Sequence, residues 1–179
     1  MTELQQQKIA HFFHVLDHDG NGILESDDFE LIGEDLSNII GYPKESVERL
    51  DLKLKAHKLF IQILKDLGKE DANITPDEWI RFFSEVVYKR ANDYINLSST
   101  YLFSLFDQDG DGYIDEREYL DMFKAYGLYT STAKKAFDQL DLNGDGRISG
   151  GELVKAFEDF FQSTDPDQPG NWIFGDWRK

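Results

Sequence analysis

Apolar residues recur at intervals of three and four in four places, each directly after a stretch of twelve mostly polar residues. The pairs that open these apolar stretches are Phe29/Ile32, Trp79/Phe82, Tyr119/Met122 and Leu153/Ala156. This spacing places each pair on one face of a helix. Three of the polar stretches are also preceded by an apolar run, namely FFHVL, YLFSLF and KAFDQL. The pattern therefore predicts four helix–loop–helix units.

The four polar stretches resemble one another in sequence. They are DHDGNGILESDD at 17–28, LGKEDANITPDE at 67–78, DQDGDGYIDERE at 107–118 and DLNGDGRISGGE at 141–152. Each has an aliphatic residue in its eighth position: Leu24, Ile74, Ile114 and Ile148. A β-favouring residue repeated at one place indicates a short strand. We expect paired loops to contact each other through these strands.

The spacing of the loops suggests two pairs and three regions. We expect an N-terminal pair in residues 1–92, a C-terminal pair in residues 99–162 and a closing segment in residues 163–179. Between the first two loops we expect a helix, a turn around GYPKES and a second helix, because proline disfavours helix in the residue before it. The segment NDYINLSS at 92–99 is the expected break between the two halves.

The loop at 107–118 has the residue pattern of a calcium site. Calcium takes 6 to 8 oxygen ligands, and a twelve-residue loop supplies them from positions one, three, five, seven, nine and twelve. Glycine in position six, here Gly112, allows the positive φ that the turn requires. The predicted ligands are Asp107, Asp109, Asp111, the Tyr113 carbonyl, Asp115 and Glu118.

The loop at 141–152 fits the same pattern with fewer acids. Its predicted ligands are Asp141, Asn143, Asp145, the Arg147 carbonyl, Ser149 and Glu152. We expect Ser149 to act through a water molecule. Gly150 and Gly151 stand where the next helix should begin, and glycine weakens helix formation. We therefore expect a functional but weaker site.

The loop at 17–28 departs from the pattern only in its last position. Its predicted ligands are Asp17, Asp19, Asn21, the Ile23 carbonyl, Glu25 and Asp28. Asp28 is one methylene shorter than glutamate, so we expect it to donate one oxygen instead of two. Six-fold coordination is closer to what Mg²⁺ demands. We predict a working site of lower calcium selectivity that holds Mg²⁺ at rest.

The loop at 67–78 lacks the ligand set. Its positions one, three and six are Leu67, Lys69 and Ala72, and Pro76 lies inside it. We expect this loop to keep the fold and to pair its strand with the first loop, without binding metal.

Composition excludes several classes of function. Acidic residues outnumber basic ones by 35 to 19, giving a net charge of −16, which disfavours nucleic acid and anionic membranes as partners. No cysteine is present, so disulfides and thiolate chemistry are excluded. No stretch reaches the roughly 20 apolar residues of a membrane span, and no nucleophile–base or cofactor motif indicates an enzyme. We expect a cytoplasmic monomer.

The four units together resemble the EF-hand superfamily. The second loop without ligands and the tail DFFQSTDPDQPGNWIFG at 159–175 are similar to the group of sarcoplasmic calcium-binding proteins, calexcitins, luciferin-binding proteins and photoproteins. The resemblance implies an all-α globule of two EF-hand pairs around an apolar interior, closed by the C-terminal segment. Trp172, Ile173, Phe174 and Trp177 are then expected to fill the core or cap a pocket.

Three functions agree with this resemblance. The first is a soluble calcium and magnesium buffer or signal modulator with three sites, favoured because the chain has only Met1 and Met122, whereas sensors tend to be rich in methionine. The second is a calcium-triggered carrier of an apolar small molecule such as a luciferin. The third is a calexcitin-like sensor with a protein target. Photoprotein chemistry is not expected, because that group uses a histidine near the C-terminus. His11, His14, His18 and His57 all lie in the first third, and we expect His18 to be solvated.

Overall fold

The computed structural model describes residues 1–178 of the chain. The N-terminal pair begins with α1 (Glu3–Leu16), β1 (Leu24–Glu25) and α2 (Ser26–Ile40). It continues with α3 (Val47–Leu67), β2 (Asn73–Ile74) and α4 (Pro76–Phe82). As predicted, a turn separates α2 from α3, and β1 pairs with β2 in antiparallel register, with Leu24 opposite Ile74.

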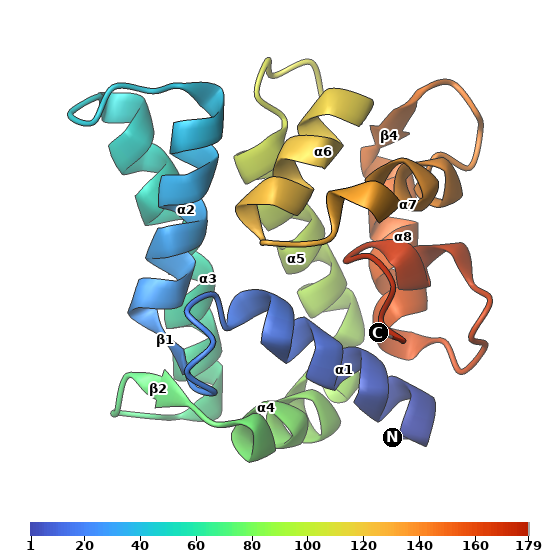
Figure 1. The fold of residues 1–179 in the computed structure, drawn as a ribbon. Coiled ribbons are helices and arrows are strands. Elements are labelled where there is room, and N and C mark those ends of the chain that lie inside the picture. The colour runs from blue at the N-terminus through green and yellow to red at the C-terminus, as the bar shows by residue number, and fades with distance from the viewer. Residues whose placement is uncertain (179) are drawn as a thin grey trace.

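The C-terminal pair repeats this arrangement. It consists of α5 (Ala91–Phe106), β3 (Tyr113–Asp115), α6 (Glu116–Ala125), α7 (Ala133–Leu140), β4 (Arg147–Ser149) and α8 (Gly150–Gln162). A short 3₁₀ turn, η3 (Thr130–Thr132), precedes α7. Strands β3 and β4 are antiparallel, with Ile114 opposite Ile148. Figure 1 shows the two pairs side by side, with α1 crossing between them and both termini on one side.

The chain breaks between the halves earlier than the sequence indicated. Residues 92–99 are helical and lie within α5, so the predicted break there is wrong. The irregular segment is instead η1 (Phe83–Val87), a π-helical turn, and η2 (Tyr88–Arg90), a 3₁₀ turn. Ser98 and Ser99 are buried in α5, and the Ser99 hydroxyl donates to the carbonyl of Asn96 at 3.1 Å. Tertiary packing therefore overrides the weak helix preference of these polar residues.

One apolar core joins the two pairs and the C-terminal segment. Phe12 of α1 stacks on Phe174 of the segment, with ring centroids 4.6 Å apart, and also packs against Phe160 of α8. Ile173 and Phe174 are buried, whereas Trp172 and Trp177 are only partly buried. The predicted all-α globule with two small sheets and a packed C-terminal segment is confirmed.

A buried lysine fastens the C-terminal segment to α1. The ammonium of Lys8 donates hydrogen bonds to the carbonyls of Asp159 (2.9 Å) and Ser163 (3.1 Å) and to Oδ1 of Asn171 (2.8 Å). Its positive charge lies at the C-terminal end of α8, where the helix dipole favours a cation. Just before Asn171, in the 3₁₀ turn η4 (Pro169–Trp172), a Cβ on Gly170 would stand 2.4 Å from the carbonyl oxygen of Ala156. This turn therefore requires glycine.

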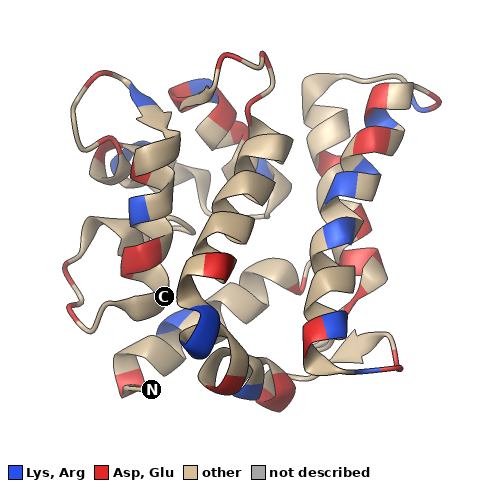
Figure 2. Ribbon diagram, turned by 180° about the vertical axis from the view of Figure 1, so that it is seen from behind, with Lys and Arg blue, Asp and Glu red and all other residues tan. Residues whose placement is uncertain are grey.

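No helix within residues 1–178 is long and apolar enough to cross a membrane. Acidic residues gather at the turns of the loops, while the basic residues are mostly on helices such as α3 (Figure 2).

Candidate metal centre

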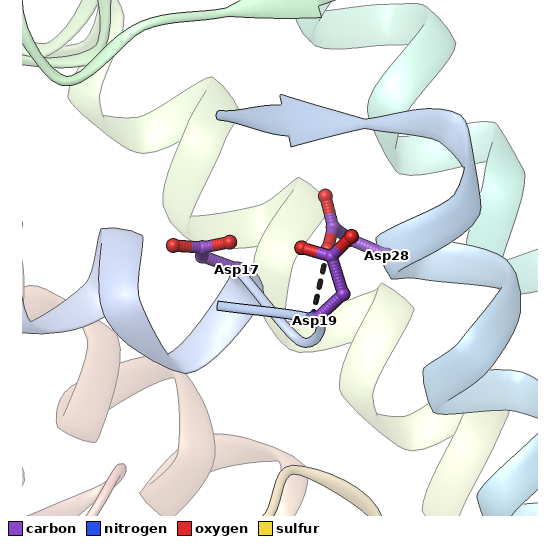
Figure 3. Close-up of side chains that lie close together, drawn as sticks. All are labelled: Asp17, Asp19 and Asp28. Atoms are coloured by element: carbon purple, nitrogen blue, oxygen red, sulfur yellow. Dashed lines mark hydrogen bonds between the residues drawn. The ribbon is translucent and has the colours of Figure 1, made fainter. Parts of the chain in front are cut away.

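Three carboxylates of the loop at 17–28 converge on one point. Oxygen atoms of Asp17, Asp19 and Asp28 all lie within 4.8 Å of one another. Asp17 directly follows α1 and Asp28 lies in the first turn of α2, so the two helices bring these acids together (Figure 3). Asp28 therefore reaches the loop interior despite its short side chain.

Backbone hydrogen bonds hold the Asp28 carboxylate in this position. Its Oδ1 accepts from the N–H groups of His18 (3.0 Å) and Asp19 (3.3 Å), and its Oδ2 accepts from the N–H of Glu25 (2.8 Å). Asp28 is only 1% exposed, and this burial raises the pKa of its carboxyl group. A buried carboxylate near two others is destabilised by desolvation and by like charge, and a bound cation would offset both effects.

The loop at 107–118 repeats the geometry with a glutamate in the last position. Asp107, Asp109 and Glu118 also have oxygens within 4.8 Å of one another. Oε1 of Glu118 accepts from the N–H of Gln108 (2.8 Å), and Oε2 accepts from the N–H of Asp115 (3.0 Å). Burial likewise raises the pKa of Glu118.

The first acid of each of these two loops has an unpartnered buried oxygen. Oδ1 of Asp17 and Oδ1 of Asp107 are buried without a hydrogen-bond donor. Their other oxygens accept from the N–H groups of Gly22 (3.0 Å) and Gly112 (3.1 Å). An orphaned buried carboxylate oxygen is costly. Because oxygen is the ligand type that Ca²⁺ and Mg²⁺ prefer, both loops fit such an ion.

The loop at 141–152 is held together differently. Both oxygens of Asp141 accept hydrogen bonds from backbone N–H groups of the loop, and Ser149 donates its hydroxyl to Glu152 at 2.7 Å. Burial opposes ionisation of Glu152, but the hydrogen bonds to it outweigh this and lower its pKa. Its three acids do not form a cluster like those above. Ser149 caps the N-terminus of α8. The helix therefore begins at Gly150, although its first two residues are glycines.

Four other predicted ligands accept hydrogen bonds from the backbone of their own loop. Asn21, Asp111 and Asp145 each accept a hydrogen bond from the backbone two residues later. The carboxylate of Asp115 caps α6 by accepting from the N–H of Glu118 at 2.7 Å. The structure thus brings together the acids in positions one, three and twelve of two loops. The full set of eighteen ligands remains a prediction.

The loop at 67–78 carries a lysine in place of a ligand. The Lys69 ammonium lies 2.6 Å from Oε1 of Glu78, the residue in position twelve. Helix α3 continues through Leu67 and ends at Gly68 with φ 66°, so the loop begins differently from the other three. Pro76 does not disrupt the loop, because it occupies the first turn of α4, where proline is favoured.

Two features beside the first loop were not predicted from the sequence. The ring of His18 is 15% exposed and its Nε2 lies 3.0 Å from Oδ2 of Asp35, so the expectation of a solvated histidine is wrong. His57 of α3 is hydrogen bonded to the hydroxyl of Ser26 at 2.9 Å. Both contacts join residues at least 17 positions apart, which loop spacing does not reveal.

Two family models match the segments that contain the loops at 107–118 and 141–152. A family model described as an EF hand domain matches residues 101–126, and another described as an EF hand matches residues 133–157. Calerythrin from Saccharopolyspora erythraea is 28% identical over 166 residues, which is 89% of this chain and 93% of calerythrin.

Two solved structures share the fold over nearly the whole chain. Coelenterazine-binding protein from Renilla muelleri, in its calcium-loaded apo form, superposes with a TM-score of 0.80 at 24% identity, covering 98% of this chain and 99% of the other. The sarcoplasmic calcium-binding protein of amphioxus has a TM-score of 0.72 at 16% identity and covers 98% of both chains.

Proposed function

We propose that this chain, which is a calcium-binding EF-hand protein of the sarcoplasmic and luciferin-binding type, is a buffer for calcium and magnesium with three metal sites. The convergence of Asp17, Asp19 and Asp28, repeated by Asp107, Asp109 and Glu118, carries the proposal. The third site is the loop at 141–152. We assign the function to the cytoplasm, where EF-hand buffers bind calcium.

Each loop contributes to binding through its own residues. In the loops at 17–28 and 107–118, the acids in positions one and three supply negative charge at the end of the entering helix, whereas in the loop at 141–152 position three is Asn143 and Asp141 alone supplies this charge. The acid in position twelve, already fixed by two or three backbone N–H groups, closes the site from the exiting helix. Because these side chains are held before the ion arrives, little ordering is needed on binding.

The packing of the core favours a buffer over a sensor. A sensor opens a methionine-rich groove on binding calcium, whereas Met122 is 1% exposed and belongs to the core. The C-terminal segment, with Phe174 stacked on Phe12, closes the same core. Opening would therefore require Phe174 to leave its contacts.

Binding of an apolar dye during a calcium titration tests the proposal. We expect calcium to bind, as followed by an indicator that competes for the ion, while dye emission stays at the level of the metal-free protein. Glu118→Gln removes a predicted ligand of the loop at 107–118 and serves as the control for metal binding. A strong rise of dye emission on adding calcium would favour the sensor instead.

The alternative function is a carrier of an apolar small molecule, which the likeness to coelenterazine-binding protein supports. Phe12, Trp79, Phe82 and Phe161 line a central cavity of about 20 Å³. A drug-sized ligand occupies roughly 300 Å³ or more, so a carrier would have to expand this core. The fluorescence of Trp79 provides the test. If this chain is a carrier, coelenterazine should quench the fluorescence of Trp79, and the variant Trp79→Phe should lose this quenching.

A further inference from the structure

Lys69 occupies the interior of the one loop that lacks a full set of metal ligands. Its ammonium lies 2.6 Å from Oε1 of Glu78, 3.4 Å from Oδ2 of Asp71 and 3.5 Å from Oδ1 of Asn73. These three oxygens belong to positions twelve, five and seven of the loop. Its side chain is only 11% exposed. One positive charge is therefore surrounded by three side-chain oxygens, two of which, those of Glu78 and Asp71, are in positions whose side chains bind the ion in a calcium loop.

Both carboxylate oxygens of Glu78 accept hydrogen bonds, as do those of the last acid in the loops at 107–118 and 141–152. In the loops at 107–118 and 141–152, one oxygen of this acid accepts from the N–H of position nine and the other from the backbone at the loop entrance. In Glu78, Oε2 accepts from the N–H of Thr75 at 2.9 Å, and the ammonium of Lys69 binds the other oxygen. The ammonium of Lys69 thus replaces the backbone N–H that binds the corresponding oxygen of the last acid in the loops at 107–118 and 141–152.

The lysine is connected to the first metal loop through the small sheet. Asn73, which the ammonium contacts, lies in β2 opposite Glu25 of β1. The N–H of Glu25 in turn donates to Oδ2 of Asp28 at 2.8 Å. The position of Asp28 therefore depends on β1, and within residues 1–178 β1 is paired only with β2, the strand that Lys69 contacts.

We propose that the Lys69 ammonium acts as a built-in cation of the loop at 67–78 and, by fixing β2 against β1, positions Asp28 for metal binding in the loop at 17–28. Lys69 is a positioning residue, since it touches no predicted ligand. Although burial alone would lower it, the pKa of Lys69 is raised by its hydrogen bonds to Glu78 and Asp71, so the charge is permanent at neutral pH. The inference rests on the proposed function, because it assumes that the loop at 17–28 binds metal.

Removal of this charge has two opposite effects on that site. Loss of a nearby positive charge makes the region more negative and by itself strengthens cation binding. Loss of the positioning contact leaves Glu78 and Asp71 without their counter-ion and loosens β2, which weakens binding. Because the ammonium is already neutralised by two carboxylates, we expect the second effect to exceed the first.

The backbone amides of the position-six glycines report on each site separately. Gly22, Gly112 and Gly146 each donate to the first acid of their own loop, at 3.0, 3.1 and 2.8 Å. In a calcium titration followed by NMR, Lys69→Met should weaken the site reported by Gly22 roughly 3- to 30-fold, which lies within the range of coupling between residues of one hydrogen-bond network. The sites reported by Gly112 and Gly146 should change less than about twofold, as expected for distant residues.

Two further variants separate charge from other causes. Lys69→Arg keeps the charge and should bind nearly as wild type. Lys44→Met removes an exposed lysine from the turn between α2 and α3 and should bind calcium as tightly as wild type or slightly more tightly. The inference would be overturned if Lys69→Met bound calcium at the site reported by Gly22 as tightly as wild type or more tightly. It would also be overturned if Lys69→Met and Lys69→Arg weakened calcium binding at this site to the same extent. If Gly22 does not respond to metal in the wild type, the proposed function fails in this loop instead.

Discussion

At the scale of single residues, we predict that Asp28 determines how the first loop discriminates between calcium and magnesium. The structure shows that its carboxylate reaches the other acids, held by the N–H groups of His18, Asp19 and Glu25. A working site with a short last acid is therefore consistent with the geometry. A carboxylate that reaches with one oxygen suits the smaller, six-coordinate Mg²⁺ better than Ca²⁺.

Replacing Asp28 with glutamate should raise calcium affinity relative to magnesium in this loop. We expect the ratio of the two affinities to change about tenfold, or about 1.4 kcal/mol, because the longer side chain can donate two oxygens. Competition titrations monitored at Gly22 measure it, and Glu118→Asp in the third loop is the matched reverse change. An unchanged ratio in Asp28→Glu would refute the assignment of selectivity to this residue.

The pair of Lys69 and Glu78 makes a pH-dependent contribution to stability. Hydrogen bonds from Lys69 and from the Thr75 backbone lower the pKa of Glu78 from 4.5 to about 2. A carboxyl group whose pKa is lower in the folded state stabilises the fold above its unfolded pKa, and this contribution is lost as the pH falls through the folded value. The sensitive window is therefore pH 4.5 to 2.

In metal-free protein, Lys69→Met should lower the free energy of unfolding at pH 7 by about 1 kcal/mol, the upper end for a partly exposed ion pair. The difference from wild type should shrink as the pH falls from 4.5 towards 2. Urea unfolding at several pH values, with Lys44→Met as the control, measures it. A difference that does not depend on pH would show that packing of the lysine stem, and not its charge, is responsible.

At the scale of elements, the twelve-residue loops were predictable because their ligands are contiguous in sequence. The pairing of Leu24 with Ile74 and of Ile114 with Ile148 followed from the eighth position. The break between the halves was misplaced, because polar residues in α5 such as Ser98 are held by tertiary burial. The contact between Lys8 and Asn171 spans 163 residues and has no local signal.

The second loop should regain metal binding when its missing positions are restored. Asp71, Thr75 and Glu78 already occupy positions five, nine and twelve. The variant L67D/K69D/E70G/A72G supplies the acids in positions one and three and the two glycines, and calorimetry should then count four calcium sites in place of three. The matched control E70G/A72G lacks the new acids and should still show three. Three sites in both variants would mean that the path of the loop, and not its ligand set, prevents binding.

The C-terminal segment depends on close approach at Gly170. A Cβ there would stand 2.4 Å from the Ala156 carbonyl oxygen, so Gly170→Ala should destabilise the protein by about 1–3 kcal/mol, as overpacking does. Thermal unfolding of calcium-loaded protein measures it. Gly150→Ala is the control, because its Cβ would meet only the Phe103 ring at 3.8 Å. Equal melting temperatures for the two variants would contradict tight seating of the segment.

At the scale of the whole molecule, we expect metal binding to stabilise the fold, because the chain has a large negative charge. The chain carries a net charge of −16, and the acids concentrate in the loops (Figure 2). Three divalent ions would reduce this to about −10 and relieve repulsion within the molecule. Each ion also stabilises the folded state by mass action, by about 4 kcal/mol at 1,000 times its dissociation constant.

Calorimetric titration of the metal-free protein with calcium, with and without millimolar magnesium, counts the metal sites and shows at which of them magnesium competes. We expect three calcium sites, with magnesium weakening the apparent calcium affinity most at one of them. That site should be the loop at 17–28, so the magnesium effect should diminish in Asp28→Glu. Fewer than two calcium sites would contradict the proposal that this protein is a calcium buffer with three metal sites.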